Sequence, residues 1–245
     1  RALREHDIDL ITFSQPNASF QEHLLLYEYL HLRLEFSTLV VPLVFDDMRE
    51  DNIRSGVLLA LEDQAVLNKL LTTSIAPRLS NMNLESDSLI SDKDKTLQAR
   101  AEAWFEHKLT IYLPGWYERA EAKSWIALSL YRLRNLIFQI DPTSKRRKIT
   151  PVYQRNLDAL QDIYQQAHLD GVKVISYIVP IRNDVGIPYY LEEYSKFKNQ
   201  MEKLSSKNNA VFLNLESIVA ARFWGTKPST SLGGPQEIDF MHFQA

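Results

Sequence analysis

The stretch TLVVPLVFDDMRE, residues 38–50, indicates the fold class of this chain. It opens with an unbroken apolar run, Thr38 to Phe45, that is rich in β-branched side chains. A run of this length without alternation is typical of a parallel strand that is buried on both faces. The strand then ends in Asp46, Asp47, Arg49 and Glu50, which are charged. Charged residues at the carboxyl end of a buried strand lie where open α/β sheets place their ligands.

The residues before this strand predict a βαβ unit. Ser19 and Glu22 form a capping-box pattern, and the apolar residues after them predict a buried helix that runs to about Arg33. Residues 8–13 form another apolar run, which we expect to be a buried strand. Strand, helix and strand in this order are joined by a right-handed crossover. Because the first residues have helical spacing, we expect an N-terminal piece of the domain, including a strand, to precede Arg1.

Residues 53–148 interrupt the α/β pattern. They show helical spacing at 53–71, 96–112 and 116–140 without a convincing strand, which predicts a helical insertion or cap. The basic run Lys145 to Lys148 at its end suits an anionic partner or a solvated linker. We favour the linker, because charge runs without interleaved aromatic residues are common in loops.

The α/β pattern resumes after this insertion. We expect a helix that ends at Gly171, a strand, an amphipathic helix and a short strand, at residues 151–168, 172–179, 189–206 and 210–215. Residues 1–52 and 149–245 are therefore predicted to be the two parts of one α/β domain. With helices on both faces of a mostly parallel sheet, the expected architecture is a three-layer α/β/α sandwich.

The composition limits the classes of function. An apolar share of 45% is ordinary for a globular protein, and a net charge of -3 gives no general reason to expect nucleic acid as a partner. No segment has the unbroken apolar length of a transmembrane helix. The chain contains no cysteine, which excludes disulfides, thiolate nucleophiles and cysteine metal sites.

The candidate catalytic pair lies near the end of the chain. Asp239 and His242 are three positions apart, after a stretch rich in Gly, Pro and Ser that predicts a loop. A carboxylate behind an imidazole fixes its tautomer, so that the other ring nitrogen can take a proton from a nucleophile. The same spacing also arises by chance on protein surfaces, so the rest of the chain has to support this interpretation.

These features together resemble the SGNH (GDSL-like) hydrolase superfamily, and in particular its bacterial cell-surface branch with DltD, AlgX and AlgJ. In that family a nucleophilic Ser follows the first strand, an oxyanion-hole Gly the second and an Asn the third. An Asp-x-x-His block ends the domain. Asp239 and His242 match the last block, the turn at residues 15–18 stands where the second belongs, and residues 45–47 stand where the third belongs.

Two positions depart from the family pattern. Asn17 stands where the family has Gly, and Asp46 stands where it has Asn. An ionised carboxylate cannot donate a hydrogen bond, so Asp46 would repel a developing oxyanion unless it is protonated or turned away. The family layout places the nucleophilic serine upstream of Arg1. Ser14 is the alternative within the chain, although it lies very close to Asn17.

The resemblance implies a serine esterase or O-acyltransferase that acts on acyl groups of a carbohydrate or cell-wall polymer, with no cofactor and no metal. Asp47, Arg182 and Asn183 follow predicted strands and are candidate contacts for a polar substrate. The family further implies a location outside the cytoplasm, an N-terminal membrane tether outside this chain and a membrane-bound acyltransferase as partner. The alternative is a catalytically silent domain that binds a glycan or scaffolds a surface assembly.

Overall fold

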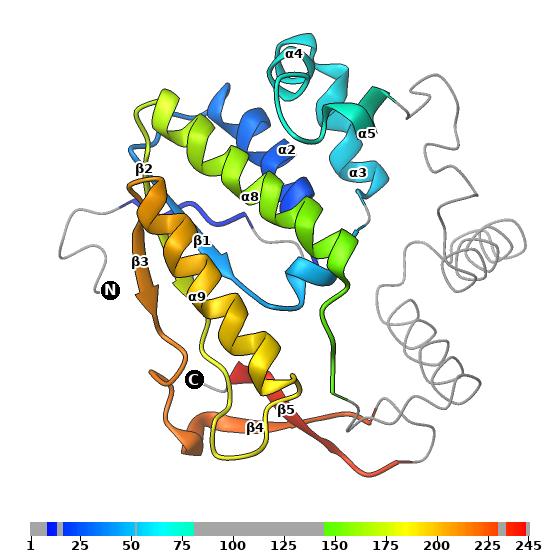
Figure 1. The fold of residues 1–245 in the computed structure, drawn as a ribbon, viewed down its shortest axis with the longest axis vertical. Coiled ribbons are helices and arrows are strands. Elements are labelled where there is room, and N and C mark those ends of the chain that lie inside the picture. The colour runs from blue at the N-terminus through cyan, green and yellow to red at the C-terminus, as the bar shows by residue number, and fades with distance from the viewer. Residues whose placement is uncertain (1–8, 14–16, 52, 81–144, 230–233, 244–245) are drawn as a thin grey trace, which may run out of the picture.

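The computed structural model describes residues 9–13, 17–51, 53–80, 145–229 and 234–243. Their architecture is mixed α/β, with a small parallel sheet, helices packed against it and a separate two-stranded ribbon (Figure 1). The helices expected at residues 96–112 and 116–140, and the candidate Ser14, lie outside the described residues.

Three parallel strands form the sheet in the order β1-β2-β3. Strand β1 spans Thr38–Leu43, β2 spans Lys173–Ile178 and β3 spans Val211–Asn214. Val40, Ile175 and Val211 lie side by side across the sheet. The parallel strands expected at these three places are therefore confirmed, each shorter than its apolar run.

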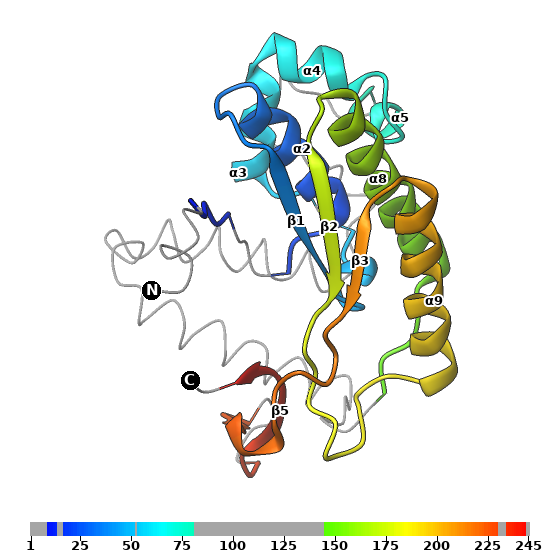
Figure 2. The ribbon, with the colours of Figure 1, turned by 90° about the vertical axis from the view of Figure 1, so that its left-hand side faces the viewer.

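Helices cover one face of the sheet. Helix α8 (Thr150–Leu169) and helix α9 (Leu191–Lys207) lie on the same side of the three strands (Figure 2). Helix α2 (Phe20–His31) packs beside α8 and begins with the expected capping box, in which the Glu22 N–H donates to Ser19 Oγ at 3.2 Å. Gly171 has a φ of 73° just after α8, a left-handed conformation that glycine adopts without steric cost.

Residues 53–80 form short helices in place of one long helix. They are α3 (Ser55–Leu58), the 3₁₀ helix η2 (Leu59–Glu62), α4 (Gln64–Leu70) and α5 (Ala76–Ser80). The Asp63 carboxylate accepts the Ala65 N–H at 2.9 Å, so it caps α4 and interrupts the helical run. Val57, Val66 and Leu70 belong to the main hydrophobic core, so this part of the predicted insertion packs onto the α/β domain.

Residues 9–13 do not form the buried strand that their apolar pattern predicts. The side chains of Leu10, Ile11 and Phe13 are exposed, and the segment lies on the side of the sheet opposite α8 and α9 (Figure 2). A strand is stable when its backbone pairs with a neighbour and its side chains are covered. Among the described residues, neither condition is met for residues 9–13, and β1 is the outermost strand on its side of the sheet.

The second face of the sheet presents apolar side chains to solvent. Val40, Val211 and Leu213 are 48%, 53% and 42% exposed, and they alternate along the strands with residues that face the helices. Within the described parts of the chain, no helix lies over this face. The described part of the chain therefore forms two layers, one of helices and one of strands, whereas a parallel sheet is normally covered on both sides.

The C-terminal residues form an antiparallel ribbon beyond the sheet. A 3₁₀ helix, η4 (Ala221–Phe223), leads into β4 (Trp224–Lys227), which pairs with β5 (Glu237–Phe243). Asp239 and His242 thus lie in strand β5, after the stretch whose Gly, Pro and Ser content predicts a loop. No helix in the described part of the chain is long and apolar enough to cross a membrane.

Candidate functional site

A bulge in the ribbon brings Asp239 and His242 together. Thr226 pairs with Ile238 and Trp224 pairs with Phe243, so a short step along β4 faces a much longer step along β5. The surplus residues of β5, which include Asp239 and His242, are pushed out of the ladder. In a regular strand, residues three positions apart point to opposite faces, and the bulge removes this obstacle.

Asp239 holds the bulge and the imidazole ring at the same time. Its Oδ1 accepts the backbone N–H groups of Met241 at 3.1 Å and His242 at 3.0 Å. The His242 Nδ1 lies 3.0 Å from Asp239 Oδ2 and 3.1 Å from Oδ1. Burial acts to raise the pKa of Asp239, but the hydrogen bonds from Met241 and His242 outweigh it and hold this pKa below its usual value. Asp239 is therefore an ionised carboxylate that orients the ring.

The outer side of the His242 ring is open to solvent. The His242 side chain is 84% exposed, whereas that of Asp239 is 13% exposed. Asp239 is the only hydrogen-bonding partner of the ring among the described residues, and it faces Nδ1. A neutral imidazole that donates its Nδ1–H to a carboxylate keeps a lone pair on Nε2. The pair can therefore accept a proton from a group that approaches Nε2.

A second polar cluster is built on Asp46, just past the carboxyl end of β1. Its Oδ1 accepts a hydrogen bond from Arg49 Nη1 at 3.1 Å. Its Oδ2 accepts one from the Tyr189 hydroxyl at 3.1 Å and one from Arg146. Burial raises the pKa of the Tyr189 hydroxyl well above its usual range, so this hydroxyl remains a donor. Both oxygens of Asp46, the residue expected in the oxyanion hole, are thus engaged.

Asp47 lies beside this cluster, at the start of the 3₁₀ helix η1 (Asp47–Arg49). Burial raises the pKa of Asp47 to about 7, and the negative charges of Asp46 and Glu50 act in the same direction. The pKa of Glu50 is also raised, first by burial and then by Asp46. Asp47 therefore exchanges a proton near neutral pH, a property that is frequent among residues of functional sites.

Tyr189 connects the Asp46 cluster to the ribbon. Its hydroxyl lies 4.0 Å from the sulfur of Met241, the residue before His242. The backbone N–H of Arg182 donates to the Phe240 carbonyl at 3.1 Å, which ties β5 to the segment that follows β2. Asp46 follows the carboxyl end of β1, and Arg182 and Tyr189 follow that of β2, at the edge of the sheet that binds ligands in open α/β folds (Figure 1).

Arg182 and Asn183 are both at this edge, but their surroundings differ. Arg182 Nε and Nη2 donate to the two carboxylate oxygens of Asp184 at 2.8 Å and 3.1 Å, and Nη1 donates to the Gly225 carbonyl at 2.9 Å. The guanidinium group therefore fastens the ribbon to the sheet, and a substrate would have to compete for it. Asn183 is exposed.

Asn17 has a left-handed backbone conformation. Its φ is 54°, in the left-handed region that glycine adopts most readily and that asparagine tolerates better than most residues. Its side chain is exposed, just ahead of the buried cap residue Ser19.

Arg146 and Tyr189 are members of the Asp46 cluster that the sequence pattern does not reveal. Arg146 belongs to the basic run expected to be a solvated linker, and the structure corrects this expectation because Arg146 bridges to Tyr189 and pairs with Asp46. No local signal marks it, since Asp46 is remote in the sequence. The side chains along the run alternate in direction, so that Arg146 points inward and Arg147 points outward.

Comparison with known proteins finds no matching family model, no matching curated protein and no matching solved structure. Among the described residues, no group of three or more His, Asp or Glu side chains is arranged to hold a metal ion.

Proposed function

We propose that this chain contributes the proton-transfer part of an SGNH-like serine esterase or O-acyltransferase. In this proposal Asp239 orients His242, and His242 Nε2 serves as the general base. The observation that carries it is the bond from His242 Nδ1 to the Asp239 carboxylate in a ring that is otherwise 84% exposed. An oriented imidazole with an accessible Nε2 is what the activation of a hydroxyl nucleophile requires.

The proposed reaction has two halves. A serine hydroxyl attacks the carbonyl carbon of an acyl ester, and His242 takes its proton and passes it to the leaving alcohol. Water or a sugar hydroxyl then attacks the acyl-serine and gives its proton to His242, which passes it to the serine oxygen as the bond between that oxygen and the acyl group breaks. The proposed substrate is the acylated hydroxyl of a carbohydrate or cell-wall polymer outside the cytoplasm.

Two further observations support the family assignment within this proposal. Asn17 has a positive φ at the position where the family has an oxyanion-hole glycine. The exposed apolar face with Val40, Val211 and Leu213 is the face that the third layer of an α/β/α sandwich would cover. We therefore propose the three-layer SGNH fold for the complete domain.

The test is hydrolysis of an aryl acetate by the full-length protein and by its His242→Ala variant. We expect the variant to lose roughly a thousandfold in kcat/KM, because the serine loses its general base. Free imidazole groups also hydrolyse aryl acetates slowly, so His168→Ala is the matched control. His168 is an exposed histidine near the end of α8, and this end of the helix lies far from β4 and β5 (Figure 1). Equal rates for wild type and His242→Ala would remove His242 from the mechanism.

Labelling by a fluorophosphonate separates a serine enzyme from simple imidazole catalysis. We expect the wild-type protein to be labelled on one serine, and the His242→Ala variant to be labelled much more slowly. A protein that turns over aryl acetates without being labelled would contradict the serine mechanism.

A catalytically silent binding domain is the second candidate function. The observation that favours it is that Arg49, Arg146 and Tyr189 engage both oxygens of Asp46. Such a saturated carboxylate offers no donor to an oxyanion. If the protein shows no turnover but binds a polysaccharide in a manner that His242→Ala leaves unchanged, this function replaces the enzymatic one.

A further inference from the structure

Next to the Asp46 cluster, two stretches that are distant in sequence lie side by side, residues 145–149 and residues 188–193. Arg146 and Tyr189 form a parallel β-bridge, and the Arg146 N–H donates to the Pro188 carbonyl at 2.8 Å. Further along, the Lys148 N–H donates to a Glu193 carboxylate oxygen at 2.6 Å. The basic run is thus fixed against the start of α9.

The side chains of the two stretches alternate between the inside and the outside. Arg146 and Tyr189 point inward to Asp46. Their neighbours Arg147 and Tyr190 are on the outside, where the Arg147 guanidinium lies 4.7 Å from the centre of the Tyr190 ring. The inner residues therefore belong to the candidate site, and the outer residues form a separate surface.

This outer surface combines cations with exposed apolar side chains. We call it the basic–apolar patch, and its members are Lys145, Arg147, Lys148, Ile149, Tyr190 and Leu191. Its aliphatic members are well exposed, with Ile149 at 45% and Leu191 at 67%. Of the nearby acids, Glu193 accepts the Lys148 N–H and offsets one of the three cations, and Glu192 is paired with Lys196 at 2.6 Å. The patch therefore has a surplus of positive charge in a chain whose net charge is -3.

We propose that the basic–apolar patch binds the surface of an anionic lipid membrane. Each lysine or arginine near such a surface is attracted by the negative head groups, and exposed aliphatic side chains can enter the interfacial region. The whole chain carries a net negative charge, so only a local surplus of cations can produce this attraction. Because Arg146 and Tyr189 share the two stretches with the patch, membrane contact would place the candidate site close to the bilayer.

The apolar members favour a lipid surface over an anionic polysaccharide. A sugar polymer presents hydroxyl and charged groups, and proteins bind its rings mainly with open aromatic faces. Here the face of Tyr190 is covered by Arg147, and Ile149 and Leu191 are aliphatic. Aliphatic groups beside cations match a surface that offers negative charges above hydrocarbon. This inference does not depend on the proposed esterase activity.

The test is sedimentation of the full-length protein with lipid vesicles at low ionic strength. One set of vesicles contains phosphatidylcholine and phosphatidylglycerol in a two-to-one ratio, and the other contains phosphatidylcholine alone. We expect binding to the first set only. The variant Arg147→Gln/Lys148→Gln is expected to bind roughly tenfold more weakly, because it removes two of the cations of the patch. Ile149→Ser/Leu191→Ser is expected to weaken binding by a similar factor, because it removes the apolar contact.

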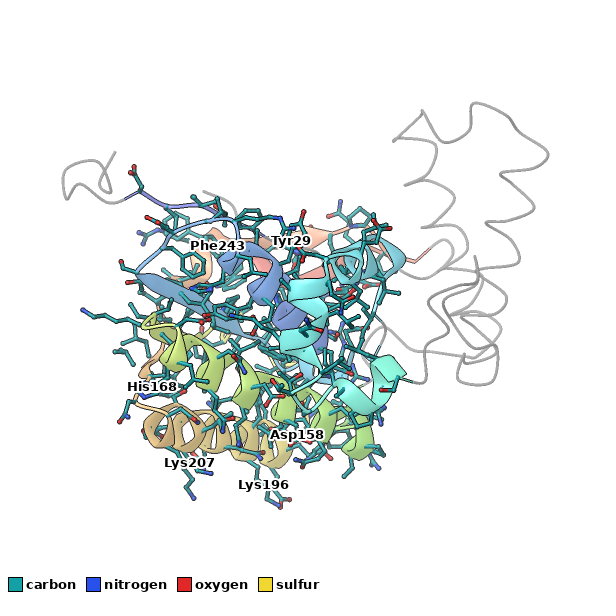
Figure 3. The ribbon with its side chains drawn as sticks, turned by 90° about the horizontal axis from the view of Figure 1, so that it is seen from above. Tyr29, Asp158, His168, Lys196, Lys207 and Phe243 are labelled. Carbon is teal, nitrogen blue, oxygen red and sulfur yellow. The ribbon has the colours of Figure 1, made fainter. Side chains whose placement is uncertain are left out.

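Matched variants control for charge and apolarity elsewhere on the surface. Lys203→Gln/Lys207→Gln removes the same charge from the exposed side of α9, where Lys207 projects away from the body (Figure 3). Leu169→Ser removes an aliphatic side chain that is 76% exposed at the end of α8. Both controls should bind as the wild type does.

Three results would overturn the proposal. The first is that the wild-type protein does not sediment with the anionic vesicles, and the second is that the control variants lose as much binding as the patch variants. The third is that only the charge variant loses binding while the protein binds dextran sulfate as well as it binds vesicles, which would identify an anionic polymer as the partner. Circular dichroism of each variant confirms that it remains folded.

Discussion

The polar cluster at the amino end of the sheet contains the same kinds of side chain as the candidate site at the carboxyl end, but it is closed. It consists of Tyr27, Glu28, His31, Lys69 and Asp170. The Tyr27 hydroxyl donates to Asp170 at 2.8 Å, and His31 Nδ1 lies 3.3 Å from the same carboxylate. The Lys69 Nζ lies 3.2 Å from Glu28 and 3.3 Å from Asp170. Each of these groups faces another member of the cluster.

The two ends differ in what they leave unused. Glu28 is fully buried, neither of its oxygens has a hydrogen-bond partner among the described residues, and the nearby charge of Lys69 is its compensation. At the carboxyl end the His242 ring keeps Nε2 open to solvent while Asp239 holds Nδ1. A closed cluster can contribute to stability but has no group to offer a substrate. We therefore expect substitutions in the closed cluster to lower stability, and substitution of the exposed His242 to affect chemistry.

The largest effect on stability is expected for Lys69→Met at the amino end. This change leaves the Glu28 carboxylate buried without an opposite charge, which should lower the free energy of unfolding by about 3 kcal/mol. Burial already raises the pKa of Glu28 against the opposing effect of Lys69, and the loss of Lys69 raises it further. A group whose pKa is raised in the folded state adds stability at low pH, and this stability is lost as the pH rises. The difference in stability between the variant and the wild type should therefore be smaller in acid. Urea unfolding of both proteins at two pH values measures it.

A second substitution tests whether the buried charge is the cause. In Lys69→Met/Glu28→Gln the buried charge of Glu28 is removed as well, and Asp170 keeps its hydrogen bond from the Tyr27 hydroxyl, so much of the lost stability should return. The control Lys203→Met removes an exposed lysine and should change little. If the double variant is less stable than Lys69→Met, the cluster is held by packing and not by charge.

Asp47→Asn at the carboxyl end is expected to change stability by a smaller amount, and to increase it. The pKa of Asp47 is raised to about 7, first by burial. Its contribution to stability is therefore complete below the ordinary aspartate pKa and is lost as pH rises through about 7. Asparagine does not ionise, so the variant should be more stable than wild type by on the order of 2 kcal/mol at alkaline pH. In acid the two should be similar, and parallel stability curves would contradict this account.

The parts of the fold that local pattern predicts are those set by local physics. Residues 38–45 predicted β1 because a continuous β-branched run needs burial on a sheet. Ser19 and Glu22 predicted the start of α2, because a capping box is satisfied within one turn. Gly171 predicted the end of α8 in the same way. Each of these features depends on residues that are neighbours in the chain.

The parts that pattern does not predict depend on residues that are distant in sequence. Residues 9–13 have the apolar pattern of a strand, but a strand also needs a neighbouring edge, which the pattern cannot supply. Arg146 looks like part of a linker until the chain brings Asp46 to it. The contact between Asp239 and His242 was predicted from spacing, but the bulged ribbon that permits it depends on the register between β4 and β5.

The smallest effect on stability is expected for His242→Ala, and its comparison with His31→Ala tests the distinction between the two ends directly. The His242 side chain is 84% exposed, so its removal should change the free energy of unfolding by less than about 0.5 kcal/mol. His31 stacks on Tyr27 at 5.7 Å and meets the edge of Phe36 at 5.8 Å, so its removal should cost about 1 kcal/mol. Urea unfolding of the two variants at one pH measures both values. A residue whose loss leaves folding intact while turnover falls is retained for its chemistry. If His242→Ala destabilises the protein as much as His31→Ala does, the Asp239–His242 pair is a structural brace of the ribbon, and the distinction between a closed and an open end fails.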